Sequence, residues 1–540
     1  MIEKLLENWL DRASERSYQA VFVQMLAADG YTVLHSTRHC LLEYGKDILA
    51  IAPDGVGCAF QLKGDPGGRM KISEFRKDIQ PQLTQLMAQS PSYPGFPTGA
   101  HRAYLVSNGQ FEEEVQVAVR EMNNGPYPSK TLLWSRGHLF DMCKIHASAL
   151  WPSELRDNRA LLELYMADPR EPLEVDILSG MMESILKLSA DNDCMKQTEL
   201  ARAASSAAWL TGIVTAIHAE KENHHAVISA WTLCCVSLIA ASEKHGDASV
   251  SAVGESLKLA QKALIDALAA LWSDVTKKDH LVEGDAFTDP EIFGWRVGVL
   301  FGLLSCLSIV DEEMPILDAA SRNALRSWLK QPPRQPELWG EAVVAHLIPW
   351  VTWLRRNDPT LRPDAEISEL ATAVIVANQP NSTIALANPY YDFDAVLRHR
   401  LGMPLSAKRR SLAREAIAGN SYTAEALLHL LVRANMKGKC KSLWARFTKL
   451  SHHRLVLDKS WHYCLVQAPT GSNETKIYPS SYQWSRLKCE ALNGICRGEV
   501  PSVLQRSPWL LALWWQVAPH RMNSEAVRVF VDEILPGWGT

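Results

Sequence analysis

Residues 45–63 read GKDILAIAPDGVGCAFQLK and are the most informative stretch of the chain. An apolar run begins directly after Asp47, and the pair Asp54-Gly55 that follows it is a strong signal for a hairpin turn. A second run returns from Cys58 to Lys63. The stretch therefore predicts two antiparallel strands joined at the Asp54-Gly55 turn.

The polar side chains of this hairpin are predicted to gather on one face. Side chains alternate between the two faces of a strand, so Gln61 and Lys63 point the same way while Leu62 points into the core. If the strands pair across the turn, Asp47 lies near both. An acid, an amide oxygen and a lysine placed together form an arrangement that is typical of metal-dependent phosphodiesterases.

The hairpin and its surroundings resemble the PD-(D/E)xK, or restriction-endonuclease-like, nuclease superfamily, in particular its Mrr-like branch, where the second acid is often Gln. In that family a helix ending in a Gly-aromatic pair precedes the hairpin, and residues 17–31 end in Gly30-Tyr31. A third core strand follows the hairpin, and residues 102–109 fit that place. The resemblance covers roughly the first quarter of the chain and implies an α/β nuclease domain there.

The resemblance also implies the chemistry of the hairpin. Asp47, Gln61 and the backbone carbonyl of Leu62 would bind Mg²⁺ or Mn²⁺, because Mg²⁺ prefers hard oxygen ligands. A metal-bound water is acidic enough to attack phosphorus. Lys63 would orient that water and stabilise the charge that develops on the phosphate. The neutral oxygen of Gln61 binds a cation less strongly than a carboxylate would.

The second carboxylate of such a site usually comes from the first helix, and here the sequence departs from the family. Gln19 stands where many Mrr-like proteins carry Glu. Glu15 lies one turn earlier on the same helical face, and Glu43 lies just before the hairpin. We rank Glu43 and Glu15 as substitutes. The alternative is that Gln19 and Gln61 together make a weakened or inactive site.

Cations follow the hairpin directly, and those chosen as candidate phosphate contacts are Lys71, Arg76 and Lys77. Beside a metal site they would neutralise backbone phosphates without reading base sequence. A solvated helix face is the alternative for each residue taken singly. Their closeness in sequence to the hairpin favours phosphate contact for the group.

The length of 540 residues exceeds what one hydrophobic core supports, so several domains are expected. The predicted fold is multidomain, with an N-terminal α/β restriction-endonuclease-like domain followed by a large all-α region. We set the limits at 1–150, 151–384 and 385–540. Ala- and Leu-rich segments with helical spacing predict helices at residues 177–188, 199–218, 225–241, 249–271, 289–309 and 319–329.

Charge and cysteine content restrict the cellular setting. A net charge of −4 argues against a uniformly basic coat for nucleic acid, so any binding must come from local patches. The 11 cysteines show no paired CxxC spacing, which is typical of reduced intracellular proteins. The N-terminus lacks signal-peptide architecture, and we expect a cytoplasmic protein. Residues 226–242 carry no charge, and a buried helix is favoured over a membrane span there.

The C-terminal third holds the clearest basic cluster, with Lys439, Lys441 and Arg446 as candidate nucleic-acid contacts. Trp444 and Phe447 are interleaved with them, and cations with aromatic rings can hold a backbone and stack bases. The two aromatic residues are also three positions apart, as in the buried face of a helix. Both interpretations stay open.

Two functions compete at this point. The first is a Mg²⁺-dependent DNA endonuclease, an effector of bacterial restriction or anti-phage defence, whose helical domains sense a trigger or bind protein partners from a multi-gene defence system. The second is a catalytically degenerate nuclease fold that binds nucleic acid as a scaffold within a defence complex. Restriction-like folds often act as dimers because each site cuts one strand, so a homo-oligomer is a further hypothesis.

Overall fold

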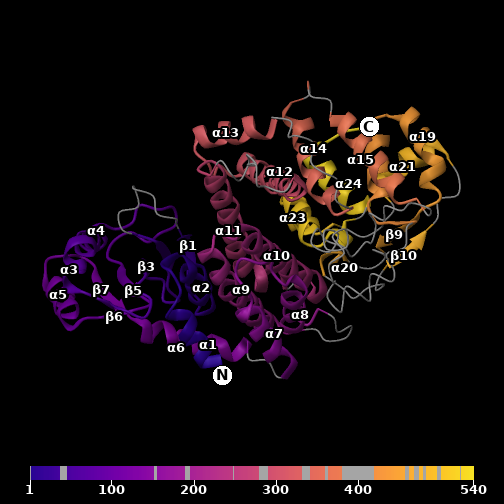
Figure 1. Cartoon of the computed structure of the whole chain (residues 1–540). Helices are drawn as coiled ribbons and strands as arrows, with labels where there is room; N and C mark the ends of the chain where they lie inside the picture. Colours follow the sequence, from indigo (N-terminus) through magenta and orange to yellow (C-terminus); the bar gives the residue numbers. More distant parts are fainter. Residues whose placement is uncertain are drawn as a thin grey trace. The chain divides into compact units, whose positions relative to one another are not determined.

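A computed structural model of the chain describes residues 2–36, 46–150, 155–188, 195–246, 249–278, 290–330, 341–358, 360, 363–379, 419–455, 461–466, 474–477, 482–494, 500–522 and 524–539. An N-terminal mixed α/β region is followed by a largely helical region (Figure 1). The coarse layout predicted from the sequence is therefore confirmed.

The N-terminal region is built on a five-stranded sheet with the order β1-β2-β3-β5-β7. Its strands are β1 Thr32–Ser36, β2 Ile48–Ile51, β3 Gly57–Lys63, β5 Arg102–Ser107 and β7 Lys130–Trp134. The strands β1, β2 and β3 pair antiparallel, whereas β5 is parallel to both β3 and β7. The minor strands β4 Arg69–Met70 and β6 Gln110–Phe111 pair with each other.

The predicted hairpin is confirmed as β2 and β3. Gly55 adopts a positive φ of 82°, which glycine tolerates because it has no Cβ, and the Ala52 N–H donates to the Val56 carbonyl at 2.9 Å. The expected helix before the hairpin is α2 Glu15–Ala28, and the expected third strand is β5. These elements form where the sequence places them.

Alternation along β2 and β3 separates two hydrophobic cores. Ile48, Phe60 and Leu62 belong to the first core, on the face covered by α2. Leu49 and Ala59 belong to the second core, on the face covered by α4 Gln80–Ala88. Other helices at these two faces are α1 Ile2–Leu10, α6 Arg136–Leu150 and α5 Glu113–Asn124, and the short turns α3 Ile72–Glu74 and η1 Phe75–Ile79 lead into α4. The position of a residue along β2 or β3 therefore determines which of the two faces its side chain lies on.

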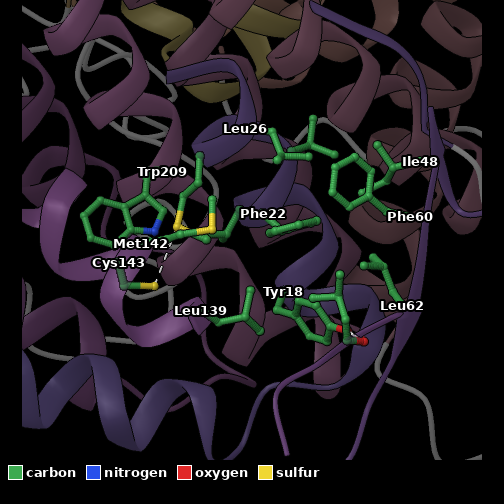
Figure 2. Close-up of a cluster of buried hydrophobic side chains, with 14 of the residues drawn as sticks. Tyr18, Phe22, Leu26, Ile48, Phe60, Leu62, Leu139, Met142, Cys143 and Trp209 are labelled. Carbon is green, nitrogen blue, oxygen red and sulfur yellow. Dashed lines mark hydrogen bonds between the residues drawn. The ribbon is translucent and has the colours of Figure 1, made fainter. Parts of the chain in front are cut away.

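The first core extends beyond residue 150. Trp209, from α9 Gln197–Glu220, packs with Phe22 and with residues of α6 (Figure 2). Leu259, from α11 Ser249–Val275, belongs to the same core. Helices that follow the sheet in sequence thus bury part of the apolar face of α2, and at roughly 25 cal/mol per Å² this burial stabilises the sheet region.

Contacts within the chain define two compact units, which divide inside two long helices. The first unit comprises Met1–Cys234 and His245–Ala263, and the second comprises Cys235–Lys244 and Leu264–Thr540. This division differs from the limits predicted from the sequence, which stay predictions. The predicted limit at residue 384 lies outside the described residues.

The helices predicted from Ala/Leu periodicity are present within a few residues of their expected ends. They are α8 Val175–Ile185, α9, α10 His224–His245, α11, α12 Pro290–Glu313 and α13 Ala319–Lys330. The described part of the chain after the sheet region also contains the helices α7 Leu155–Met166, α14 Val343–Asn357, α15 Pro363–Ala377, α18 Ala424–Arg433, α19 Lys437–Phe447, α20 His462–Leu465, α21 Trp484–Asn493, α22 Ser502–Arg506, α23 Trp509–Val517, η3 Pro519–Arg521 and α24 Ser524–Ile534.

The C-terminal region is not wholly α-helical, and the all-α prediction is wrong in this detail. Three short strands form a sheet with the order β10-β9-β8, from β8 Asn420–Ser421, β9 Ser451–Leu455 and β10 Glu474–Ile477. The strand β9 is antiparallel to β10 and parallel to β8. These strands have two to five residues and are rich in polar side chains, so they show no alternating apolar pattern.

Among the residues that the structure describes, three helices are long and apolar enough to cross a membrane by length and composition, namely α9, α10 and the segment Gly294–Glu313 of α12. Their most apolar windows are 78%, 89% and 83% buried within the protein. The uncharged residues 226–242 lie in α10. This burial favours the core-helix interpretation, because these apolar faces are already covered by protein.

Candidate active site

The candidate site lies where β2 and β3 separate. Ile48 pairs with Phe60, whereas β3 continues to Lys63, so the last residues of β3 have no partner strand on the β2 side. There the Asp47 carboxylate accepts a hydrogen bond from the Leu62 N–H at 2.6 Å. The N–H and C=O of one strand residue point to the same neighbour. The Leu62 carbonyl is therefore expected on the edge that Asp47 occupies.

Asp47 and Gln61 both lie at the end of the β2–β3 pairing. Asp47 lies in a bend directly before β2, and its N–H donates to the Phe60 carbonyl at 2.9 Å, whereas alternation along β3 puts Gln61 on the face of Ala59. Both side chains are buried, with 9% of Asp47 and 1% of Gln61 exposed. Both residues therefore lie at the Phe60–Leu62 segment of β3, and the predicted closeness of their side chains stays a prediction.

The two ends of the Gln61 carboxamide differ in their surroundings. Its Nε2 donates a hydrogen bond to Oε1 of Gln82, on α4. Its Oε1 is buried and accepts no hydrogen bond from the described part of the chain. A buried acceptor without a hydrogen-bond partner lowers the stability of the fold by about 1–3 kcal/mol. Binding of a cation or of a hydrogen-bond donor to this oxygen would remove that cost.

Lys63 follows two residues later on the same face, at the end of β3. Its side chain is half-buried, and its ammonium forms no ion pair with any of the described residues. Its backbone is held on the opposite face by Tyr18 of α2. The Tyr18 hydroxyl donates to the Lys63 carbonyl at 3.0 Å and accepts from the Lys63 N–H at 3.2 Å. The backbone of Lys63 is therefore held in place, while its ammonium forms no ion pair with a described residue.

Tyr18 is fully buried and also contacts the carbonyl of Val106, at 3.3 Å. Burial raises the pKa of Tyr18 well above its usual value, and the negative charges of Glu15 and Asp47 add to the rise. The hydroxyl stays protonated as a result and remains able to donate. It joins the ends of β3 and β5 to the helix that covers them.

Two of the three candidate supporting positions can be placed. Glu15, at the start of α2, accepts a hydrogen bond from the Gly64 N–H at 3.2 Å, directly after Lys63. A Cβ at Gly64 would lie 2.8 Å from the Glu15 backbone nitrogen, so this approach requires glycine. Gln19 donates to Ser36 of β1 at 3.2 Å. Glu43 lies outside the described residues.

The geometry allows a direct test of fit for a metal ion. No group of three or more His, Cys, Asp or Glu residues capable of holding a metal occurs among the residues whose positions are described. The ligands expected here are one carboxylate, one amide oxygen and one backbone carbonyl. Only the carboxylate comes from one of those four residue types, so the expected site would not form such a group. The Asp47 carboxylate and the unpaired Gln61 oxygen are hard donors that suit Mg²⁺ or Mn²⁺. The residues present fit the ion.

The first basic group lies immediately before α4. Lys71 precedes α3, and Arg76 and Lys77 lie in η1; all three are exposed. Exposed Glu74 and Asp78 lie on the same turns and reduce the net positive charge. The cations are free to meet solvent or phosphate, and none forms an ion pair with a described residue.

The second basic group lies on α19. Lys441 and Arg446 are exposed and Lys439 is half-buried. Phe447 is buried, and Trp444 stacks on it with ring centroids 5.4 Å apart. Of the two interpretations of these aromatic residues, packing of the helix accounts for Phe447. The buried ring of Phe447 is not accessible for base stacking.

Two residues at the site, Tyr18 and Gln82, were not predicted from the sequence. Tyr18 carries a hydroxyl on the apolar side of α2, next to Phe22 and Met25 in the first core. Gln82 lies one residue before the buried Leu83 of α4. A polar group beside a buried helical stripe is the only signal for either, and it does not identify the partner.

Comparison of the chain with models of protein families, with curated proteins and with solved structures finds no match.

Proposed function

We propose that the N-terminal region is a metal-dependent DNA endonuclease of the PD-(D/E)xK, Mrr-like type, which hydrolyses phosphodiester bonds. The observation that carries this proposal is the meeting of Asp47 and the edge of β3 at the point where β2 and β3 separate, next to a buried Gln61 oxygen without a partner. Lys63, whose ammonium forms no ion pair with a described residue, lies on the same face of β3 as Gln61.

The residues would divide the work as follows. Asp47, Gln61 and the Leu62 carbonyl would hold Mg²⁺ or Mn²⁺, which when bound supplies an acidic water and neutralises charge on the phosphate. Lys63 would hold the attacking water in position through its ammonium and would stabilise the added negative charge on the phosphate oxygens. Tyr18 keeps the Lys63 backbone in place, which fixes the origin of that long side chain.

The binding of DNA would rest on local charge. Lys71, Arg76 and Lys77 are exposed on the turns that lead into α4, the helix that carries Gln82. They would contact backbone phosphates and position the duplex without reading bases. The group on α19, with Lys439, Lys441 and Arg446, would add a second contact. A net charge of −4 makes such patches necessary.

The biological setting belongs to the same proposal and rests on the family resemblance. We place the protein in the cytoplasm as an effector of bacterial restriction or anti-phage defence, with protein partners from a multi-gene system and with helices that sense a trigger. Seven of the described cysteines are buried as free thiols, which supports a reducing compartment. A homo-oligomer would allow two sites to cut both strands.

A nucleic-acid-binding scaffold is the second candidate. Gln61 in place of an acid favours it, and so does Gln19, which bonds to Ser36 of β1. With one described carboxylate, Asp47, among the expected ligands, a metal would be held weakly. The scaffold account predicts DNA binding without cleavage.

The two candidates separate in one experiment. The full chain is incubated with supercoiled plasmid DNA in Mg²⁺, Mn²⁺ or EDTA, beside Lys63→Met, which keeps the length of the side chain and removes its charge. The enzyme account expects nicking in Mn²⁺ or Mg²⁺ that is absent in EDTA and lost in the variant. Binding that is unaffected by metal, with no nicking at any concentration, supports the scaffold.

A further inference from the structure

The interaction between Gln61 and Gln82 has a direction that matters for a metal ion. A carboxamide has a donor end and an acceptor end, and only the oxygen can ligate a cation. In this structure the Nε2 end of Gln61 is bound to Oε1 of Gln82, and Oε1 of Gln61 is buried without a partner.

The position of Gln82 in the fold makes it suited to fix this direction. It lies on α4, which packs on the sheet face that carries Gln61, and its own side chain is half-buried. Its neighbours Leu83, Leu86 and Met87 are fully buried, so the helix cannot rotate locally without losing core contacts. The backbone position from which Gln82 presents its acceptor is therefore fixed relative to β3.

We propose that Gln82 is a positioning residue, which binds the amide nitrogen of Gln61 and thereby turns the Gln61 oxygen toward the divalent metal. This inference rests on the proposed function, because it supposes that the site holds a metal. A carboxylate at position 61 would need no such partner, since both of its oxygens can ligate. The glutamine pair would thus be the arrangement that allows Gln to stand where the family often has an acid.

The test measures Mn²⁺ affinity of the full chain by calorimetry and by the electron paramagnetic resonance of free Mn²⁺, without DNA. Gln82→Leu removes the acceptor at similar volume, and Gln85→Leu makes the same change at an exposed position of α4. We expect Gln82→Leu to weaken Mn²⁺ binding about 3- to 10-fold, the range of one net hydrogen bond, and Gln85→Leu to leave it unchanged. Melting temperatures in EDTA report any loss of folding separately.

A second background separates orientation from packing. In Gln61→Glu the side chain has two equivalent oxygens, so adding Gln82→Leu should no longer weaken Mn²⁺ binding. A purely structural role for Gln82 would give the same loss in both backgrounds, and that result overturns the inference.

The remaining outcomes are also decisive. Equal Mn²⁺ affinity in the wild-type chain and in Gln82→Leu overturns the inference alone, provided that Asp47→Asn weakens binding. If the wild-type chain binds no Mn²⁺ and Asp47→Asn makes no difference, the metal site itself fails, and the proposed endonuclease fails with it.

Discussion

The Asp47 carboxylate accepts the Leu62 N–H at 2.6 Å, so the acid expected to hold a metal also terminates the β2–β3 pairing. This backbone N–H would otherwise be buried without a partner, because β2 begins only at Ile48. One oxygen atom thus has a structural task that is independent of catalysis. The two roles can be separated by mutation.

Asp47→Asn and Asp47→Ala should therefore affect folding differently. An asparagine oxygen can still accept from Leu62, and we expect the free energy of unfolding in EDTA to fall by less than about 1 kcal/mol. Alanine leaves the N–H unpaired and should cost about 1–3 kcal/mol. Urea unfolding followed by circular dichroism measures both. Equal losses in the two variants would show that the hydrogen bond is not what stabilises this edge.

Tyr18→Phe tests the hydroxyl that holds the backbone of Lys63. The change keeps the ring in the first core but leaves the Lys63 N–H and its carbonyl without their partner. We expect a loss of about 1–3 kcal/mol in unfolding free energy and a drop in any cleavage rate. Tyr93→Phe, at a position that is 37% exposed, is the matched control and should change stability by less than about 0.5 kcal/mol. Similar small effects of both changes would contradict the positioning role of Tyr18.

Glu341 gives the second unit a pH-dependent stability. Its carboxylate is buried, accepts from the Tyr422 N–H at 3.0 Å, and also accepts from the side chains of Asn378 and Ser421. Burial raises its pKa to about 7, from an ordinary value of 4.5, although these hydrogen bonds act in the opposite direction. The folded protein therefore holds a proton that the unfolded chain loses between these two pH values.

Because the folded pKa is raised, the contribution of Glu341 to stability is full below pH 4.5 and disappears as the pH rises through 7. The change should amount to about 2–3 kcal/mol between pH 5 and pH 8. Glu341→Gln removes this titration. We expect the fall in unfolding free energy over that range to be smaller in the variant by the same amount. Identical pH profiles for both proteins would contradict the raised pKa.

Salt dependence of DNA binding tests the basic group before α4. Replacement of Lys71, Arg76 and Lys77 by alanine should weaken binding at every sequence and reduce the slope of log K against log salt by about 1 per lost phosphate contact. Measurement in Ca²⁺ avoids cleavage. The same replacement of Lys439, Lys441 and Arg446 on α19 is the comparison. A slope that changes only in the α19 variant would move the main DNA contact to the C-terminal region.

Local patterns in the sequence were sufficient to predict the hairpin. The Asp54-Gly55 turn and the alternation around Gln61 depend on neighbours in sequence, and β2, β3, α2 and β5 form where these patterns indicate. The long helices were also predictable, because their apolar spacing repeats over many residues. Both results follow from periodicities that are properties of the backbone.

The missed features depend on contacts between residues that are distant in sequence. The hydrogen bond from Tyr18 to Lys63 joins residues 45 positions apart, and the hydrogen bond from Gln61 to Gln82 joins residues 21 positions apart. Neither hydrogen bond produces a periodic pattern of residues in the sequence. The edge strands β1 and β7 and the small sheet of β8, β9 and β10 are short, so apolar alternation has few residues in which to appear. Glu43, the first choice for a second carboxylate, stays a prediction.

The most direct test of the central claim is the cleavage of supercoiled plasmid DNA by the full chain in Mn²⁺ or Mg²⁺, measured beside Asp47→Asn and Lys63→Met. Lys221→Ala, at an exposed position outside the site, is the control. The account predicts metal-dependent nicking by the wild-type chain and the control, with at least a roughly 100-fold loss in both site variants. Nicking that persists in EDTA, or that both site variants retain in full, would contradict it.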